Sequence, residues 1–217
     1  MSGWTKKRRL IRRYDLTASI YDMRYAEEQK AKIEAALEKV KVKWRGLVLD
    51  VGCGTGILFD YVADRPKMIV GLDLSKKTLL EARARTIKKK TDNVHLVQAD
   101  ADNMPFVDSE FDNVFAITVL QNAPNPKNML REIRRVAKDE AAFVLTGLKS
   151  IFSPPKFKRL LKQAGLRVDE SEDKHLKCYV TICRNSCRKA FAYTDIHSGA
   201  ARPHTQKGSG PELPKLL

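Results

Sequence analysis

The stretch VLDVGCGTG, residues 48–56, places three glycines within five positions directly behind an apolar run. A glycine loop between a strand and the following helix leaves backbone N–H groups free and directs the positive end of the helix dipole at an anion. The glycines Gly52, Gly54 and Gly56 follow a G-x-G-x-G pattern, which differs from the G-x-G-x-x-G pattern of dinucleotide-binding proteins. The loop therefore predicts a pyrophosphate or carboxylate ligand and disfavours a nicotinamide or flavin cofactor.

Short apolar runs alternate with stretches of helical periodicity along the rest of the chain. Apolar strands that are separated by helices predict an α/β fold with a parallel sheet covered on both faces. The last two runs have no helix between them, so they predict a terminal hairpin with one strand antiparallel to the rest. The predicted strands span residues 47–51, 68–74, 94–100, 113–120, 141–148, 166–173 and 176–184, and the predicted helices span residues 19–40, 76–90, 126–137 and 154–164, with a further helix from about residue 57.

Two carboxylates follow the glycine loop at the ends of predicted strands. Asp73 closes the second strand, where a carboxylate can accept hydrogen bonds from both hydroxyls of a ribose. Asp100 closes the third strand, where it can accept from an exocyclic adenine amine while the backbone N–H of Ala101 meets a ring nitrogen. Together with the loop, these positions describe a ligand with a carboxylate, a ribose and an adenine. S-adenosylmethionine fits that description.

The ordered motifs LDVGCGTG, GLDLS, ADADNMPF and LREIRRVAK resemble those of the class I, Rossmann-like methyltransferases that use S-adenosylmethionine. This group includes the ubiquinone and menaquinone C-methyltransferases. The resemblance implies a three-layer sandwich around a seven-stranded, mostly parallel sheet whose last strand is antiparallel. It also implies that a tyrosine of the leading helix touches the cofactor, a pattern that Tyr21 matches and Tyr14 matches more weakly.

The cofactor site that follows from this resemblance contains no metal. Its predicted residues are Tyr21, Asp50, Gly52, Cys53, Gly54, Gly56, Asp73, Leu74, Asp100, Ala101 and Thr118. One departure from the family pattern is visible, because a Pro-Gly-Gly turn that often follows the fourth crossover helix is replaced by residues 138–142, KDEAA. We expect this departure to change a turn and to leave cofactor binding intact.

The acceptor of the methyl group is expected beyond the carboxyl ends of the strands, where open parallel sheets bind their ligands. Transfer from a sulfonium is an in-line displacement that requires alignment and exclusion of water, and a dedicated base is not essential. Gln121 and Asn122 follow the fourth strand, so a side-chain carbonyl there could hold an amine or hydroxyl towards the methyl group. These two residues are the predicted catalytic pair. The alternative is that they only cap the following loop.

The charge of the chain bears on its partners. Lysine and arginine number 41 against 26 acidic residues, a formal net charge of +15, which favours a polyanionic partner, first nucleic acid and second an anionic membrane surface. A merely solubilising surface is the other explanation. The predicted RNA-binding arm contains Lys6, Lys7, Arg8, Arg9, Arg12 and Arg13.

Three functions remain open on this basis. The favoured one is methylation of RNA, such as a base of rRNA or tRNA; the alternatives are a quinone-type small-molecule methyltransferase and an idle subunit that binds only cofactor or RNA. An activator subunit is a further possible partner. The predicted organisation is a basic arm (1–13), a methyltransferase domain (14–184) and a basic, disordered tail (185–217).

The absence of two sequence patterns bears on the compartment of the protein and on its metal content. No apolar run has the length of a signal peptide or a membrane span, which predicts a cytoplasmic protein without membrane insertion. Cys53, Cys178, Cys183 and Cys187 show no paired spacing. Ordinary strand and tail positions are therefore favoured over a disulfide framework or over a zinc site that includes His175.

Overall fold

A seven-stranded mixed sheet forms the centre of the computed structural model, which describes residues 3–40, 44, 46–172 and 175–186. The strand order is β3-β2-β1-β4-β5-β7-β6; β7 runs antiparallel to both neighbours, and the other pairs are parallel. The strands are β1 (Leu47–Val51), β2 (Met68–Asp73), β3 (Val94–Gln98), β4 (Phe111–Ala116), β5 (Ala137–Leu148), β6 (Leu166–Glu172) and β7 (Cys178–Asn185). The predicted α/β class, the parallel sheet and the terminal hairpin are confirmed.

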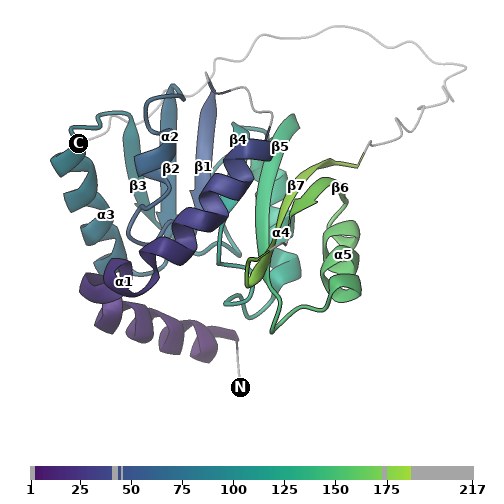
Figure 1. Cartoon of the computed structure of the whole chain (residues 1–217), viewed down its shortest axis with the longest axis horizontal. Coiled ribbons are helices and arrows are strands. Elements are labelled where there is room, and N and C mark those ends of the chain that lie inside the picture. Colours follow the sequence, from purple (N-terminus) through teal and green to yellow (C-terminus); the bar gives the residue numbers. More distant parts are fainter. Residues whose placement is uncertain (1–2, 41–43, 45, 173–174, 187–217) are drawn as a thin grey trace, which may run out of the picture. The chain divides into compact units, whose positions relative to one another are not determined.

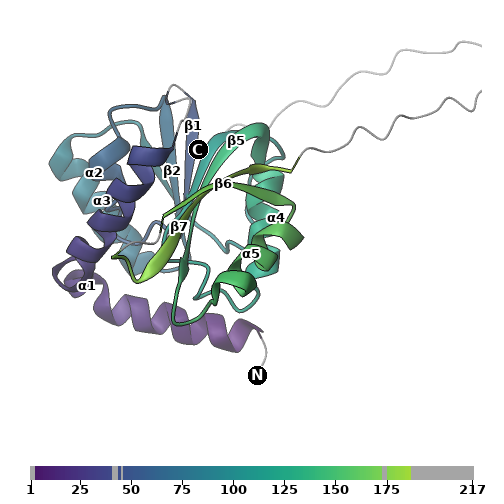
Figure 2. The same ribbon diagram turned by 45° about the vertical axis from the view of Figure 1, so that its right-hand side comes forward.

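Helices pack on both faces of the sheet and complete three layers (Figures 1 and 2). The helices are α1 (Gly3–Lys39), α2 (Phe59–Val62), α3 (Lys76–Lys89), α4 (Pro126–Val136) and α5 (Pro154–Gln163). One buried core joins α1, α2 and α3 to one face of the sheet, and a second joins α4 and α5 to the other face. Because both faces of the central strands are buried, these strands are continuously apolar.

Helix α1 begins much earlier than the sequence indicates. The predicted helix covers residues 19–40, whereas α1 runs without interruption from Gly3 to Lys39 and includes the described part of the basic arm. Figure 1 shows that the purple start of α1 passes along the lower edge of the sheet and that its later part lies across one face. We call residues 3–15 the first limb. The arm is therefore an integral part of α1.

The expected turn after α4 does not form. Helix α4 ends at Val136 and β5 begins at Ala137, so residues 138–142 belong to a strand. Lys138 pairs there with Asp112 at 2.9 Å, and Asp139 and Glu140 are exposed. Polar residues are tolerated because this end of β5 is solvated while the rest is buried. The helix expected from about residue 57 begins two residues later, since α2 begins at Phe59.

The two described strand cysteines lie on opposite sides of the sheet. Cys178 packs in the core with α1, α2 and α3, and Cys183 packs in the core with α4 and α5. Side chains on opposite faces cannot share one metal ion. Among the described residues, no cluster of histidine, cysteine and carboxylate side chains could hold a metal. Cys187 and most of the predicted tail lie outside the described residues.

No helix in the described part of the chain is both long and apolar enough to cross a membrane.

Candidate functional site

The glycine loop turns sharply after β1 because its three glycines adopt left-handed backbone angles. Gly52, Gly54 and Gly56 have φ values of +71°, +55° and +77°, a region that costs other residues about 1 kcal/mol or more. The loop is tied to β2 by Gly52 N–H, which donates to the carbonyl of Leu72 at 2.7 Å. A Cβ on Gly56 would come within 2.5 Å of Phe59, but a Cβ on Gly54 would meet no atom within 4 Å. Gly54 therefore borders open space.

Asp73 connects this loop to the end of β2. Its Oδ2 accepts from Gly54 N–H at 2.9 Å, and its Oδ1 accepts from Ser75 N–H at 2.8 Å. Burial raises the pKa of Asp73, and these backbone donors oppose that effect. The carboxylate is thus fixed in place and still lines the cavity beside the loop.

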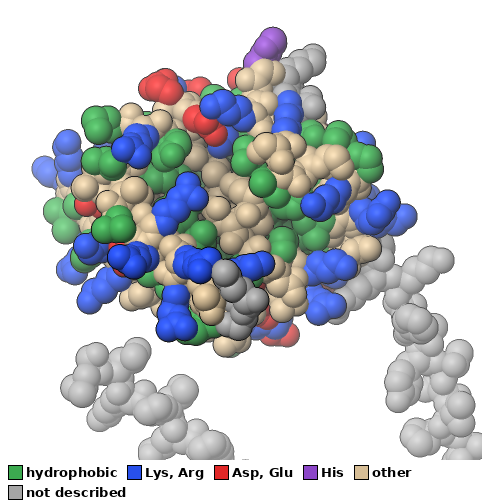
Figure 3. All heavy atoms as spheres, turned by 90° about the horizontal axis from the view of Figure 1, so that it is seen from below, with side chains coloured by type: hydrophobic (Ala, Val, Ile, Leu, Met, Phe, Trp, Pro, Cys, Tyr) green, Lys and Arg blue, Asp and Glu red, His purple; other side chains and the backbone are tan. Residues whose placement is uncertain are grey.

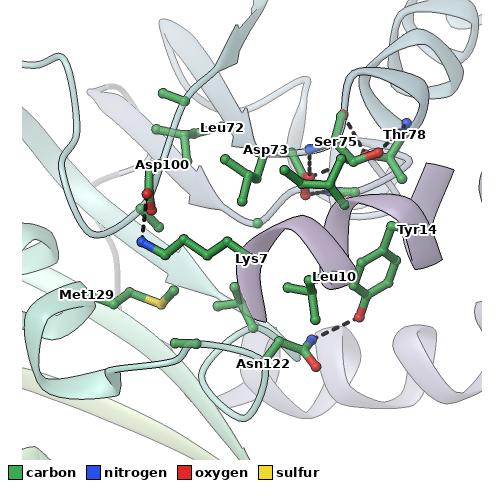
Figure 4. A pocket seen from close by; sticks show the side chains of 18 of the residues that line it. Lys7, Leu10, Tyr14, Leu72, Asp73, Ser75, Thr78, Asp100, Asn122 and Met129 are labelled. Carbon is green, nitrogen blue, oxygen red and sulfur yellow. Dashed lines mark hydrogen bonds and ion pairs between the residues drawn. The ribbon is translucent and has the colours of Figure 1, made fainter. Parts of the chain in front are cut away.

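The cavity lies at the carboxyl edge of the sheet, between the ends of β2, β3 and β4 and the first limb of α1 (Figure 4). The predicted residues that line it are Tyr21, Gly52, Gly54, Asp73, Leu74, Asp100, Ala101, Thr118 and Asn122. Asp50 and Cys53 line an adjacent, smaller cavity together with Tyr21, Gly52 and Gly54. The structure therefore brings eleven of the thirteen predicted residues to the two cavities; Gly56 and Gln121 are not among their lining residues.

The first limb supplies a wall of the main cavity that the sequence analysis did not anticipate. Lys7, Leu10, Ile11 and Tyr14 line it, and their i, i+3, i+4, i+7 spacing places them on one face of the helix. That spacing could have been recognised in the sequence. The lysine at the first position makes the stripe resemble a polar, phosphate-binding segment.

Lys7 reaches across the cavity to the end of β3. Its Nζ lies 2.6 Å from Oδ2 of Asp100 and 2.6 Å from Oδ2 of Asp102, and its side chain is only 13% exposed. Asp100 Oδ1 also accepts from Asp102 N–H at 3.0 Å. Lys7 therefore compensates two neighbouring carboxylates at the position predicted for adenine recognition, and it does not project into solvent as the predicted RNA-binding arm requires.

Asn122 is held in one orientation at the end of β4. Its Nδ2 donates to the carbonyl of Thr118 at 3.1 Å and to the hydroxyl of Tyr14 at 2.9 Å (Figure 4). Because a backbone carbonyl can only accept, the amide must turn its Nδ2 towards Thr118. Gln121 instead folds back, donating from Nε2 to the same carbonyl at 2.7 Å. Of the predicted catalytic pair, only Asn122 faces the cavity.

A network of buried polar side chains from α1 and β5 holds Thr118 in place. Thr118 has a φ of +61°, which is strained for a residue with a Cβ. Its hydroxyl donates to Gln29 at 2.9 Å and accepts from Lys32 at 3.1 Å, and its N–H donates to Thr146 at 2.7 Å. Lys32 is 1% exposed and pairs with Glu28 at 2.7 Å. This network, which sequence reasoning missed, fixes the end of β4 against α1.

Comparison with known proteins identifies a domain at the centre of this chain. Residues 49–145 match the family described as "Methyltransferase domain". A malonyl-[acyl-carrier protein] O-methyltransferase from Marinomonas sp. (strain MWYL1) is 31% identical over 177 residues, which cover 81% of this chain and 63% of the relative. A demethylmenaquinone methyltransferase from Staphylococcus saprophyticus is 33% identical over 115 residues, which cover 52% of this chain and 48% of the relative. The chain thus spans about half to two thirds of these relatives.

Solved structures share the fold over most of their length. The DhpI–SAH complex aligns with a TM-score of 0.70 at 20% identity, over 82% of this chain and 96% of that chain. A complex between the Haloferax volcanii Trm112 methyltransferase activator and a methyltransferase aligns with a TM-score of 0.70 at 21% identity, over 79% and 97%. The matched domain, the glycine loop and the sheet order together show that this chain contains a methyltransferase domain with a Rossmann-like fold.

Proposed function

We propose that this chain transfers a methyl group from S-adenosylmethionine to a nitrogen or oxygen atom of an RNA base. When bound, the cofactor supplies an electrophilic methyl group on a sulfonium. The protein must hold the cofactor, exclude water and present the lone pair of the acceptor in line. A metal ligand or a covalent nucleophile is not needed for this chemistry.

The residues of the main cavity fit the cofactor. Asp73 offers a carboxylate of fixed orientation for a ribose diol, and Asp100 lies at the adjacent strand end for an adenine amine. Gly54 borders open space on the side where any other residue would carry a Cβ. Because the loop leaves this space free, a ligand can approach its backbone closely.

The orientation of Asn122 is the observation that carries the choice of acceptor. Both hydrogens of its Nδ2 are taken by Thr118 and Tyr14, and no described residue donates to its Oδ1. An acceptor that donates an N–H or O–H satisfies this oxygen, whereas a free carboxylate would place a negative charge against it. Burial raises the pKa of Tyr14, so its hydroxyl stays protonated and can donate to a neighbouring acceptor atom. An amine or hydroxyl beside a hydrogen-bond acceptor is the pattern of a base edge.

The charge of the chain supports RNA as the carrier of that base. Binding of a small neutral substrate does not require a formal charge of +15, whereas such a charge would attract a polyanion over long range. A small apolar acceptor is the second candidate, because Leu10, Ile11 and Met129 give the main cavity apolar walls. The name of one relative, which refers to demethylmenaquinone, also favours this candidate.

Replacing Asn122 with alanine is expected to lower the single-turnover rate of methyl transfer about 10- to 100-fold while cofactor affinity stays within about twofold. Of the two ligands, the side chain should contact the acceptor and not the cofactor, so its loss should affect mainly the chemical step. Rapid-quench kinetics with radiolabelled cofactor and total RNA measures the rate, and calorimetry measures the affinity. Gln121→Ala is the matched control, because that amide lies outside the cavity-lining residues. An unchanged rate in Asn122→Ala would assign this residue to loop capping.

The acceptor class is tested separately by mass spectrometry of the labelled products. Transfer of the label to a nucleoside supports the proposal. Transfer to a lipid-soluble or protein-bound acceptor, with none to RNA, would replace it by the small-molecule function.

Cofactor affinity is expected to rise with pH up to about pH 8. Burial, with a smaller effect from the charge of Asp73, raises the pKa of Asp50 to about 8, so its carboxyl is largely protonated at pH 7. The positive charges of S-adenosylmethionine favour the ionised carboxylate, so binding should release a proton below the free pKa and release none well above it. Calorimetry in buffers of different protonation enthalpy measures this release. Asp50→Asn should bind without it, and a proton-neutral titration of the unmodified protein at pH 7 would contradict the assignment.

A further inference from the structure

We propose that the first limb of α1 is a two-sided lid: its inner stripe closes the cofactor cavity, and its outer face binds the phosphates of RNA. Cofactor and RNA then bind cooperatively because they hold the same helix in one position. The inference rests on the proposed function only in naming RNA as the polyanion.

The inner side of the lid is anchored at three strand ends. Lys7 bonds Asp100 and Asp102 after β3, and Tyr14 accepts from Asn122 after β4. A third anchor follows β2, where Oδ1 of Asp15 accepts from the Ser75 hydroxyl at 2.6 Å and from the N–H of Lys77 at 3.3 Å. Two of these partners, Asp100 and Asn122, belong to the predicted cofactor and acceptor sites. The position of the helix is therefore linked to the occupancy of the site beneath it.

The outer side of the lid presents the remaining cations. These cations are Lys6, Arg8, Arg9, Arg12 and Arg13. All five are exposed, and no described acidic side chain pairs with them. The first limb has no acidic residue before Asp15, so its outer face has one sign of charge. Dense positive charge on one face of a helix matches the backbone of a nucleic acid.

Lysines at the same edge extend this surface beyond the helix. Lys76, Lys77 and Lys127 lie in the first turns of α3 and α4 and are exposed, and those first turns contain no acidic residue. A cation in a first turn is disfavoured by the helix dipole, which prefers an anion there. Figure 3 views the molecule from this edge and shows Lys and Arg side chains scattered across it with few Asp or Glu side chains among them. An anionic chain that lies across the lid would compensate these charges.

The arrangement predicts which cations contact RNA and which one transmits the effect. Lys7 is turned inward, so it should contribute nothing to phosphate binding and should instead couple the lid to the cofactor. The outer cations should contribute to phosphate binding and have no contact with the cofactor. Single-sided substitutions can therefore separate the two roles.

The experiment measures binding of labelled oligouridylate to the full chain over a salt series, with and without S-adenosylhomocysteine. The unmodified protein should show a steep salt dependence, and each ligand should raise affinity for the other on the order of fivefold or more. Substitution of Lys6, Arg9 and Arg12 by glutamine should flatten the log–log salt slope by about 2, at roughly 0.7 for each lost phosphate contact on a single strand. The control replaces Arg83, Lys88 and Lys162, exposed cations of α3 and α5 outside the lid, and should leave the slope unchanged.

Lys7→Met distinguishes the lid from a simple basic arm. This variant should keep the salt slope of the unmodified protein and lose most of the cooperativity. A slope lowered by about 0.7 with cooperativity retained would mean that Lys7 binds phosphate, and it would overturn the two-sided arrangement. Absence of RNA binding, with binding to phosphatidylglycerol vesicles instead, would assign the outer face to a membrane and also overturn the proposal. These binding experiments do not measure methylation, so their outcome is independent of the assay that identifies the methyl acceptor.

Discussion

Asp73→Ala is expected to weaken S-adenosylmethionine binding by about 1.5 to 3 kcal/mol, or roughly 10- to 150-fold in the dissociation constant. The carboxylate should accept hydrogen bonds from the ribose, and it already holds the loop through Gly54 and α3 through Ser75. Removal of the carboxylate therefore eliminates a ligand contact and also loosens the glycine loop and the start of α3, which it holds in place. Calorimetric titration with S-adenosylmethionine and S-adenosylhomocysteine should show the same loss for both, because both carry the ribose.

A suitable control for this substitution is Asp112→Ala. Asp112 also accepts from a backbone N–H, that of Leu47 at 2.9 Å, and it pairs with Lys138. It lies at the opposite edge of the sheet, at the start of β4, so its loss should lower the melting temperature with little change in cofactor affinity. Wild-type affinity in Asp73→Ala would remove Asp73 from the cofactor site.

Gly54→Ala should separate cofactor binding from folding. The left-handed angle of Gly54 costs alanine about 1 kcal/mol, and the added Cβ meets no protein atom within 4 Å. The chain should therefore fold with a slightly lower melting temperature. The new methyl group occupies the space that borders both cavities, so we expect cofactor affinity to fall at least about tenfold, in the range of an overpacked contact.

Gly147→Ala is the reciprocal control for Gly54→Ala. Its Cβ would approach Phe157 to 2.6 Å in the core between β5 and α5. This variant should lose stability and keep its cofactor affinity, as long as it is assayed below its melting temperature. If Gly54→Ala binds the cofactor normally, the open space beside the loop is not used by the ligand.

The sheet could be predicted from the sequence because its central strands are buried on both faces and are continuously apolar. The glycine loop and both aspartates were also recognisable, since loop chemistry depends on local spacing. The exception within the sheet was residues 138–142, where a solvated strand end carries charged residues and resembles a turn.

The part of α1 that covers the site could not be predicted in the same way. Lys7 is assigned its role by Asp100, a residue 93 positions away, and no local pattern encodes such a pairing. For Lys32, the pairing with Glu28 is local, but its hydrogen bond to Thr118 joins residues 86 positions apart. A lysine in an amphipathic stripe resembles a solvated residue until its partner is known. Cations that serve the interior of a site are for this reason easily assigned to the surface.

The anchoring of α1 over three strand ends has a consequence for the order of events in a catalytic cycle. A helix that lies above the cofactor cavity obstructs exchange of the cofactor while the acceptor is bound on top of it. We therefore expect an ordered mechanism, in which S-adenosylmethionine enters first and S-adenosylhomocysteine leaves last. In such a cycle the slow step at saturation is the detachment of a helix held by Lys7, Tyr14 and Asp15, and turnover is then governed by the residence time of the spent cofactor.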